Sequence, residues 1–190
     1  MRHPIPEDIG EYLKVDSASA TGLRWLKTVN PRAKEGEEAG CKWTVPGRER
    51  ENYSVRFRNT LYLNARIIFF LKTGIDPKNL EVDHKNRISI CNDKNNLRLA
   101  TRSENQRNKN IQRNNTSGYK GVCWDKAKNK WKSAIHVNGK IINLGRFFTK
   151  EEAAIAYNEA AVKYFGEFAF LNAIPHKYCH QLEQRPNPPA

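Results

Sequence analysis

Apolar and polar residues alternate in the first half of the chain in a pattern that predicts strands followed by a helix. Tyr53, Val55 and Phe57 alternate with polar neighbours, which is the period-two pattern of a half-buried strand. Residues 65–72 then form a short apolar segment of helical character, and Gly74 ends it because glycine is favoured just beyond a helix end. The pattern therefore predicts a packed unit that mixes strands with a helix.

Two short extended segments follow, at residues 82–84 and 97–99, on either side of a polar loop. Thr101 and Glu104 then have the spacing of a capping box, which predicts a helix that starts at Arg102. The expected local order is strand, loop, strand and helix.

The second half of the chain has the pattern of a three-stranded sheet with one helix. Residues 119–124, 130–137 and 140–148 are predicted strands, and Asn138-Gly139 is a strong hairpin signal between the last two. A second capping box at Thr149 opens a helix with an apolar stripe. This helix is expected to cover one face of the sheet and leave a lysine-rich face uncovered, so the fold class is α+β.

The length of 190 residues suggests one or two small domains. Residues 1–19 are polar, with two prolines, and predict a tail, whereas residues 113–118 have the composition of a linker. We therefore expect a first domain over residues 20–112, a second over residues 113–173, and a carboxy-terminal tail over residues 174–190.

The formal net charge of +13 indicates a polyanionic partner, and the position of the charge is more informative than its total. Residues 98–150 contain 13 Lys and Arg against two acids, a local balance of +11, out of 33 Lys and Arg and 20 acids in the chain. The remaining 20 basic and 18 acidic residues nearly cancel. Because the excess is confined to about one quarter of the chain, it is typical of a binding surface for nucleic acid.

The four cysteines never form a C-x-x-C pair, so a structural zinc site of the usual spacing is not expected. No apolar stretch reaches the ~18 residues of a membrane span, and the first twenty residues lack the apolar core of a signal peptide. We expect a cytoplasmic protein with no membrane contact and no small-molecule cofactor.

A set of chemistry-bearing residues lies in the strand, loop, strand and helix segment. Asp83 and His84 are adjacent, and Asn96 and Asn105 follow them, so a metal ligand, a base and two amides share one short segment. An Asp-His pair in a turn is more often structural, and most asparagines of this segment are typical of a loop. His84 stands apart because the other four histidines lie in expected tails or on the sheet without such neighbours.

Two family resemblances bear on these residues. Residues 82–110, which include VDHKNRISICNDKNNLRLATRSENQRN, resemble the HNH (ββα-metal) nuclease motif of bacteriophage and intron-encoded homing endonucleases. Residues 115–172, which include SGYKGVCWDKAKNKWKSAIHVNGK and LGRFFTKEEAAIAYNEAAVKYFG, resemble the Apetala/ethylene-response-factor (AP2/ERF) DNA-binding domain. The resemblance implies a ββα-metal nuclease domain followed by a small domain of three antiparallel strands packed on one helix. If a phage encodes the chain, the host cytoplasm is its expected location.

The nuclease resemblance implies a role for each residue of the set. Asp83 matches the metal ligand of the first strand, and His84 matches the general base. Asn96 matches the middle residue of the motif, which holds the loop and orients the base, and Asn105 takes the place of the final histidine as a ligand. Oxygen ligands favour Mg²⁺ or Mn²⁺ over zinc. Imidazole has an unperturbed pKa of about 6.5, so it is partly neutral at physiological pH and can take a proton from water.

Eight basic side chains are candidates for DNA contact, three in the nuclease motif and five in the second domain, where the resembling domain inserts its uncovered sheet face into the major groove. They are Arg98, Arg102, Arg107, Lys120, Lys130, Lys132, His136 and Arg146. Cys123 and Asn143 stand where plant members of the family have Arg and Trp, so base specificity does not transfer.

The sequence thus predicts a metal-dependent endonuclease that acts on double-stranded DNA and is targeted by a basic domain. One site cuts one strand, so a monomer, which we expect, would nick, whereas a dimer could break both strands. The alternative is a non-catalytic, sequence-specific DNA-binding regulator on a decayed nuclease scaffold. RNA is a weaker third option, because the second domain resembles a reader of duplex DNA.

Overall fold

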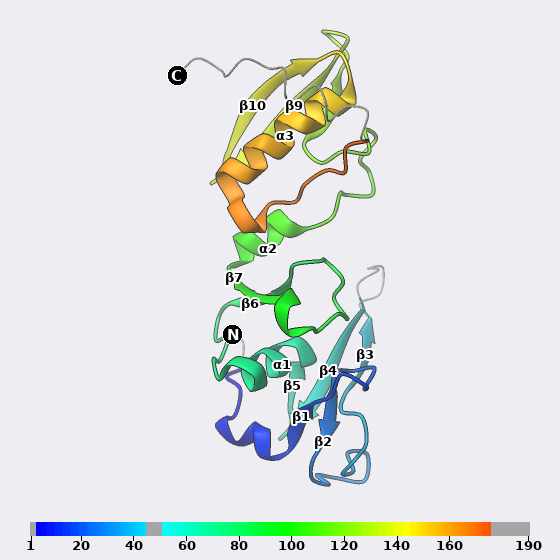
Figure 1. The fold of residues 1–190 in the computed structure, drawn as a ribbon, viewed down its shortest axis with the longest axis vertical. Helices are drawn as coiled ribbons and strands as arrows, with labels where there is room; N and C mark the ends of the chain where they lie inside the picture. Colours follow the sequence, from blue (N-terminus) through cyan, green and yellow to red (C-terminus); the bar gives the residue numbers. More distant parts are fainter. Residues whose placement is uncertain (1–2, 45–50, 176–190) are drawn as a thin grey trace. The chain divides into compact units, whose positions relative to one another are not determined.

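The computed structural model describes residues 3–44 and 51–175. The chain divides into two compact units, Met1–Asn105 and Gln106–Ala190, which are described separately below (Figure 1). The division falls seven residues before the domain boundary expected from composition. It lies within the helix Arg102–Asn108, and a helix does not have the composition of a linker. Of the expected carboxy-terminal tail, residues 176–190 lie outside the described residues.

The first unit consists of short antiparallel sheets around one longer helix. Its strands pair as β1-β2, β3-β4-β5 and β6-β7, and helix α1 packs against β1, β4 and β5. The elements are η1 (Glu7–Glu11), β1 (Leu13–Val15), β2 (Leu23–Trp25), β3 (Cys41–Thr44), β4 (Glu51–Phe57), β5 (Thr60–Leu63), α1 (Asn64–Thr73), β6 (Glu81–His84), η2 (Lys94–Asn96), β7 (Leu97–Ala100) and α2 (Arg102–Asn108). The predicted helix ends as expected, with Gly74 in the left-handed region at φ 72°.

The amino-terminal residues are part of the core, so the expected tail over residues 1–19 is wrong for those that the structure describes. Ile9 is fully buried and Leu13 is 1% exposed, in one cluster with Phe57 and Ile67. The hydroxyl of Tyr62 also donates a hydrogen bond to the carbonyl of Pro4, at 3.2 Å. Hydrophobic burial therefore holds this segment, although its surrounding sequence is polar.

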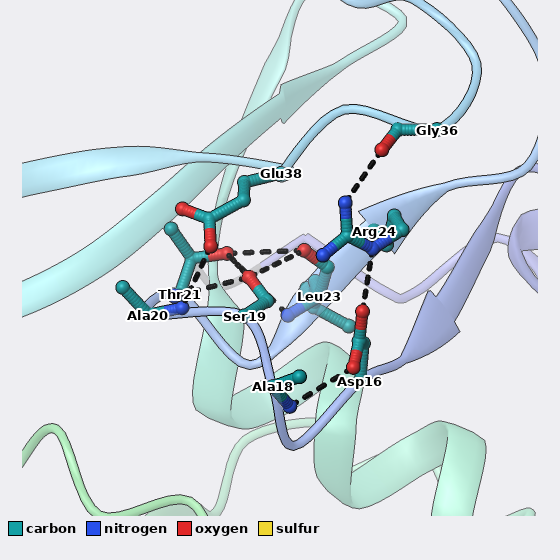
Figure 2. A network of polar contacts seen from close by, with 9 residues as sticks. All are labelled: Asp16, Ala18, Ser19, Ala20, Thr21, Leu23, Arg24, Gly36 and Glu38. Atoms are coloured by element: carbon teal, nitrogen blue, oxygen red, sulfur yellow. Dashed lines mark hydrogen bonds and ion pairs between the residues drawn. The ribbon is translucent and has the colours of Figure 1, made fainter.

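A network of polar contacts closes the loop between β1 and β2 (Figure 2). Asp16 accepts a hydrogen bond from Nε of Arg24 at 2.5 Å, and Nη1 of Arg24 donates to the carbonyl of Gly36 at 2.6 Å. The hydroxyls of Ser19 and Thr21 both lie 3.1 Å from the carbonyl of Leu23. The buried Nδ2 of Asn64, the first residue of α1, donates to the carbonyls of Thr21 and Ala39, each at 3.0 Å, and ties this network to the helix.

The second unit is a three-stranded antiparallel sheet with one helix on it (Figure 1). The strand order is β10-β9-β8, and α3 covers one face, with Ile135, Tyr157 and Ala161 among the buried residues. The elements are β8 (Val122–Asp125), β9 (Lys130–Val137), β10 (Lys140–Phe147), α3 (Lys150–Phe165) and η3 (Gly166–Phe168). The α+β fold expected from the sequence is confirmed.

Local sequence signals in the second unit correspond to the structure. Asn138 and Gly139 have φ values of 49° and 80°, the positive pair that a tight hairpin requires. Thr149 and Glu152 form both halves of the capping box. Two expectations differ: the first strand begins at Val122 rather than at residue 119, and the expected linker contains Ser117, which is 2% exposed and bonded within the unit.

Among the helices that the structure describes, none combines the length and the apolar character that crossing a membrane requires.

Candidate active site and nucleic-acid interface

Strands β6 and β7 and helix α2 form the strand, loop, strand and helix unit expected from the sequence. The two strands pair antiparallel, with Asp83 opposite Arg98. The backbone N–H of Thr101 donates to Oε2 of Glu104 at 2.7 Å, and the backbone N–H of Glu104 donates to the hydroxyl of Thr101 at 3.2 Å. This capping box starts α2 directly after β7 and so sets which residue of the helix turns toward the strands.

Asp83 lies in a buried ion pair. Its side chain is 5% exposed, and both Nε and Nη2 of Arg98 lie 2.9 Å from its Oδ2 atom. The guanidinium gives this buried carboxylate both a charged partner and hydrogen bonds. Arg98 is thus part of the site and only 9% exposed, unlike the other candidate DNA contacts.

Asn105 reaches the face of β6 that carries Asp83. The Nδ2 atom of Asn105 donates a hydrogen bond to Oε2 of Glu81. Glu81 and Asp83 are two residues apart on the same strand, so their side chains leave the same face. The structure therefore brings a helix amide and two strand carboxylates to one face of β6.

His84 leaves β6 on the opposite face, because it follows Asp83 directly. Its side chain is buried, and its Nε2 atom lies 3.0 Å from Oδ1 of Asn92, in the loop between the two strands. The carbonyl of Asn92 accepts a hydrogen bond from Nζ of Lys72 in α1, at 3.1 Å. The loop and α1 together fix the position of the imidazole.

Asn96 connects the two ends of the same loop. Its Oδ1 atom accepts from the backbone N–H of Asn86 at 2.9 Å, and its Nδ2 atom donates to Oδ1 of Asn86 at 2.9 Å and to the carbonyl of Cys91 at 2.6 Å. The backbone N–H of Lys85 also donates to the carbonyl of Asn96, at 2.8 Å. Asn96 therefore constrains the loop that also contains Asn92, the hydrogen-bond partner of His84.

The donor atoms on the Asp83 face fit a hard divalent cation. Among the described residues, no three side chains of His, Cys, Asp or Glu form a metal-binding group. The carboxylate of Asp83 and the amide of Asn105 are oxygen donors, and Mg²⁺ is commonly held by one or two carboxylates with water completing its shell. Asp83 and Asn105 are therefore the residues that would hold such an ion.

The structure adds Glu81 and Asn92 to the residues that the sequence suggested. Strand periodicity could have pointed to Glu81, because it precedes Asp83 by two positions. Asn92 has no such signal, since it is one of eight asparagines between residues 92 and 115.

The candidate DNA contacts near α2 have different environments. Arg102 is exposed. The guanidinium of Arg107 lies 4.7 Å from the ring centre of Phe165, and its Nη2 atom is 3.4 Å from Oδ1 of Asn138. Nζ of Lys120 donates to the carbonyls of Arg107 and Lys109 at 2.7 and 2.8 Å, so its ammonium closes the end of α2 within the second unit.

The remaining four candidates lie on the face of the β8-β9-β10 sheet opposite α3, as strand alternation predicts. Lys132 is the central cation of this face, paired with Cys123 on one side and Arg146 on the other. Nε of Arg146 lies 2.7 Å from Oδ2 of Asp125, and this hydrogen bond lowers the pKa of the Asp125 carboxyl. We call this surface, with Lys130, Lys132, His136 and Arg146, the basic sheet face.

The chain thus combines a unit of two strands and a helix, made of β6, β7 and α2, with a small domain of three strands and one helix. Residues 62–107 match the family model described as HNH endonuclease. The AP2-like matches fall in a second region, so the chain carries an HNH domain and an AP2-like domain. No solved structure is significantly similar to the chain.

The chain is similar to viral proteins and to plant transcription factors. An uncharacterized HNH endonuclease of Acanthamoeba polyphaga mimivirus is 33% identical over 119 residues, which are 63% of this chain and 56% of the viral protein. Protein 3.8 of Escherichia phage T7 is 36% identical over 67 residues, or 35% of this chain and 55% of the phage protein. An AP2-like ethylene-responsive transcription factor of Arabidopsis thaliana is 39% identical over 75 residues, or 40% of this chain and 16% of the plant protein. The chain thus spans about half the length of its viral relatives.

Proposed function

We propose that this chain is a metal-dependent DNA endonuclease of the homing type, which hydrolyses phosphodiester bonds of duplex DNA and nicks one strand. The observation that carries the proposal is that Asn105 bonds to Glu81 on the face of β6 that also carries Asp83, while His84 follows Asp83 directly on the opposite face of the strand. The match of residues 62–107 to the HNH endonuclease family supports it. The AP2-like region supports duplex DNA as the substrate and a separate domain as the targeting device.

In this proposal Asp83 and Asn105 hold one divalent cation, Mg²⁺ or Mn²⁺. When bound there, such an ion would supply Lewis acidity and charge neutralisation for the hydrolysis of the phosphodiester. His84 takes the proton from the attacking water. An amide oxygen next to Nε2 favours the tautomer that carries its proton there, which leaves Nδ1 to accept the proton. The products then carry 5′-phosphate and 3′-hydroxyl ends.

Two basic regions are proposed to hold the DNA. The basic sheet face contacts phosphates and bases, and the exposed Arg102 contacts phosphates beside the site. Arg98 is not proposed to contact DNA, because its buried side chain pairs with Asp83 and holds that carboxylate in position.

A plasmid nicking assay with Mg²⁺ or Mn²⁺ tests the proposal. Wild type should convert supercoiled plasmid to the open circle, and His84→Ala should lower the rate at least about 100-fold, because a general base contributes that much or more. Asp83→Asn should also abolish nicking. It is preferable to Asp83→Ala, because asparagine keeps an oxygen that can accept a hydrogen bond from the buried Arg98, whereas alanine leaves the guanidinium with no acceptor there. His3→Ala removes an exposed histidine of the same unit and should leave the rate unchanged.

DNA binding by each variant, measured by electrophoretic mobility shift, shows whether chemistry alone is lost. Binding without cleavage by the wild type, under every metal and on a plasmid that contains the native locus, would instead identify a non-catalytic regulator. A parallel assay with RNA tests the third option.

A further inference from the structure

The hydrogen bond between Asn105 and Glu81 joins helix α2 to strand β6, across 24 positions of sequence. We propose that Glu81 is a positioning residue of the nuclease site, which fixes the amide of Asn105 so that its carbonyl oxygen is the atom presented to the divalent cation. The inference rests on the proposed function, because it assigns Asn105 as a ligand.

The two ends of the Asn105 amide differ in chemistry but not in shape. Asn carries an acceptor oxygen and a donor NH₂ group of similar shape, and a half-turn of the side chain exchanges them. An oxygen can bind a cation, whereas the NH₂ group turns positive hydrogens toward it. An asparagine ligand therefore needs a partner that selects one of the two orientations.

Glu81 makes that selection. An ionised carboxylate only accepts hydrogen bonds, so the atom of Asn105 that faces Oε2 must be the NH₂ group. The carbonyl oxygen Oδ1 then lies on the other side of the amide. The structure has this orientation.

The register of β6 and β7 gives Glu81 and Asp83 different neighbours on the opposite strand, which is consistent with different roles for the two carboxylates. Asp83 lies opposite Arg98, whose guanidinium neutralises it, whereas Glu81 lies opposite the small, buried Ala100. Glu81 and Asp83 still share one face of β6. Hydrogen-bond partners that orient the ligands of a metal site are known to tune its metal affinity, and Glu81 would be such a partner for Asn105.

The experiment compares Glu81→Gln with Glu7→Gln, which removes the same charge from an exposed position of the same unit. A glutamine can accept or donate, so it no longer selects one orientation of Asn105. Glu81→Gln should weaken Mn²⁺ binding, measured by calorimetry on the full chain, by about tenfold. It should raise the Mg²⁺ concentration for half-maximal nicking by the same factor, with the rate at saturating Mg²⁺ near that of wild type. Glu7→Gln should change neither quantity.

Introducing Glu81→Gln into an Asn105→Asp variant distinguishes a positioning role of Glu81 from its other possible roles. A carboxylate has two equivalent oxygens and needs no orientation, and it would be repelled by Glu81. In this background Glu81→Gln should leave Mn²⁺ affinity unchanged or raise it. An equal loss in both backgrounds would overturn the proposal and make Glu81 a direct ligand or a structural residue.

If the Glu81→Gln single variant binds Mn²⁺ with the affinity of the wild type, the positioning role of Glu81 is also overturned. If the wild type neither binds Mn²⁺ nor nicks DNA, the nuclease proposal itself fails. Failure of the inference and failure of the proposed function therefore give different results.

Discussion

Arg98 neutralises a carboxylate that is almost entirely out of water, and this pair determines what substitutions in the site will do. Removing one member of a buried pair leaves the other charge uncompensated. Arg98→Ala should therefore lower the free energy of unfolding of the first unit by about 3 kcal/mol. Urea denaturation followed by fluorescence measures the change.

The matched control for this substitution is Arg102→Ala. Arg102 is four residues further along the chain and exposed, so the change should stay within about 0.5 kcal/mol. Similar values for Arg98→Ala and Arg102→Ala would mean that the Asp83 ion pair contributes little to stability.

At the scale of single residues, the sequence predicted the members of the site but not their hydrogen-bond partners. Asp83, His84, Asn96 and Asn105 stand in a motif whose spacing is visible along the chain, and the structure brings Asn105 to the Asp83 face. Their roles stay predictions. Their partners could not be predicted in the same way, because a hydrogen bond such as that of Asn105 to a strand residue 24 positions earlier depends on how the helix packs.

At the scale of elements, α3 packs so closely on the sheet that one position admits only glycine. Gly121 has φ +77°, and a Cβ atom there would lie 2.0 Å from Cδ2 of Tyr157. Burial also raises the pKa of Tyr157 to about 12, so the ring stays neutral and apolar in character. The ring of Tyr157 would have to move for any larger residue to fit at position 121.

Gly121→Ala and Gly118→Ala form a matched pair. Gly118 has nearly the same backbone, φ +78°, with no atom within 4 Å of an added Cβ. Gly118→Ala should therefore cost only the backbone strain, about 1 kcal/mol, whereas Gly121→Ala should cost about 2 kcal/mol more for the overpacking. Thermal unfolding of the second unit measures both. Equal losses would show that the clash relaxes at little cost.

Elements with local signals were predictable, and those that depend on distant partners were not. The two capping boxes, the Asn138-Gly139 hairpin and the alternation along β9 are each written within a few residues. The amino-terminal segment differs, because Ile9 and Leu13 are isolated apolar residues in a polar sequence. Their burial depends on Phe57 and Ile67, more than forty residues away, so local composition predicted a tail.

At the scale of the whole molecule, the excess of positive charge is concentrated in one stretch of the chain. The net charge is +13, and the stretch of residues 98–150 alone carries +11, from 13 basic and two acidic residues. Two of the cations in this stretch have internal tasks in the structure: Arg98 holds Asp83, and Lys120 bonds to two backbone carbonyls. The number of phosphates that the molecule contacts is therefore smaller than its charge suggests.

Salt dependence measures that number directly. If about five side chains meet phosphates, the logarithm of the DNA association constant should fall against the logarithm of salt concentration with a slope of roughly −4 to −5. Lys132→Ala should reduce the slope by about one, because Lys132 is central on the basic sheet face. Lys140→Ala is the control, since strand alternation directs that equally basic residue away from this face. Fluorescence anisotropy with a labelled duplex gives all three slopes, and a flat response of the wild type would exclude the basic sheet face as a DNA-binding surface.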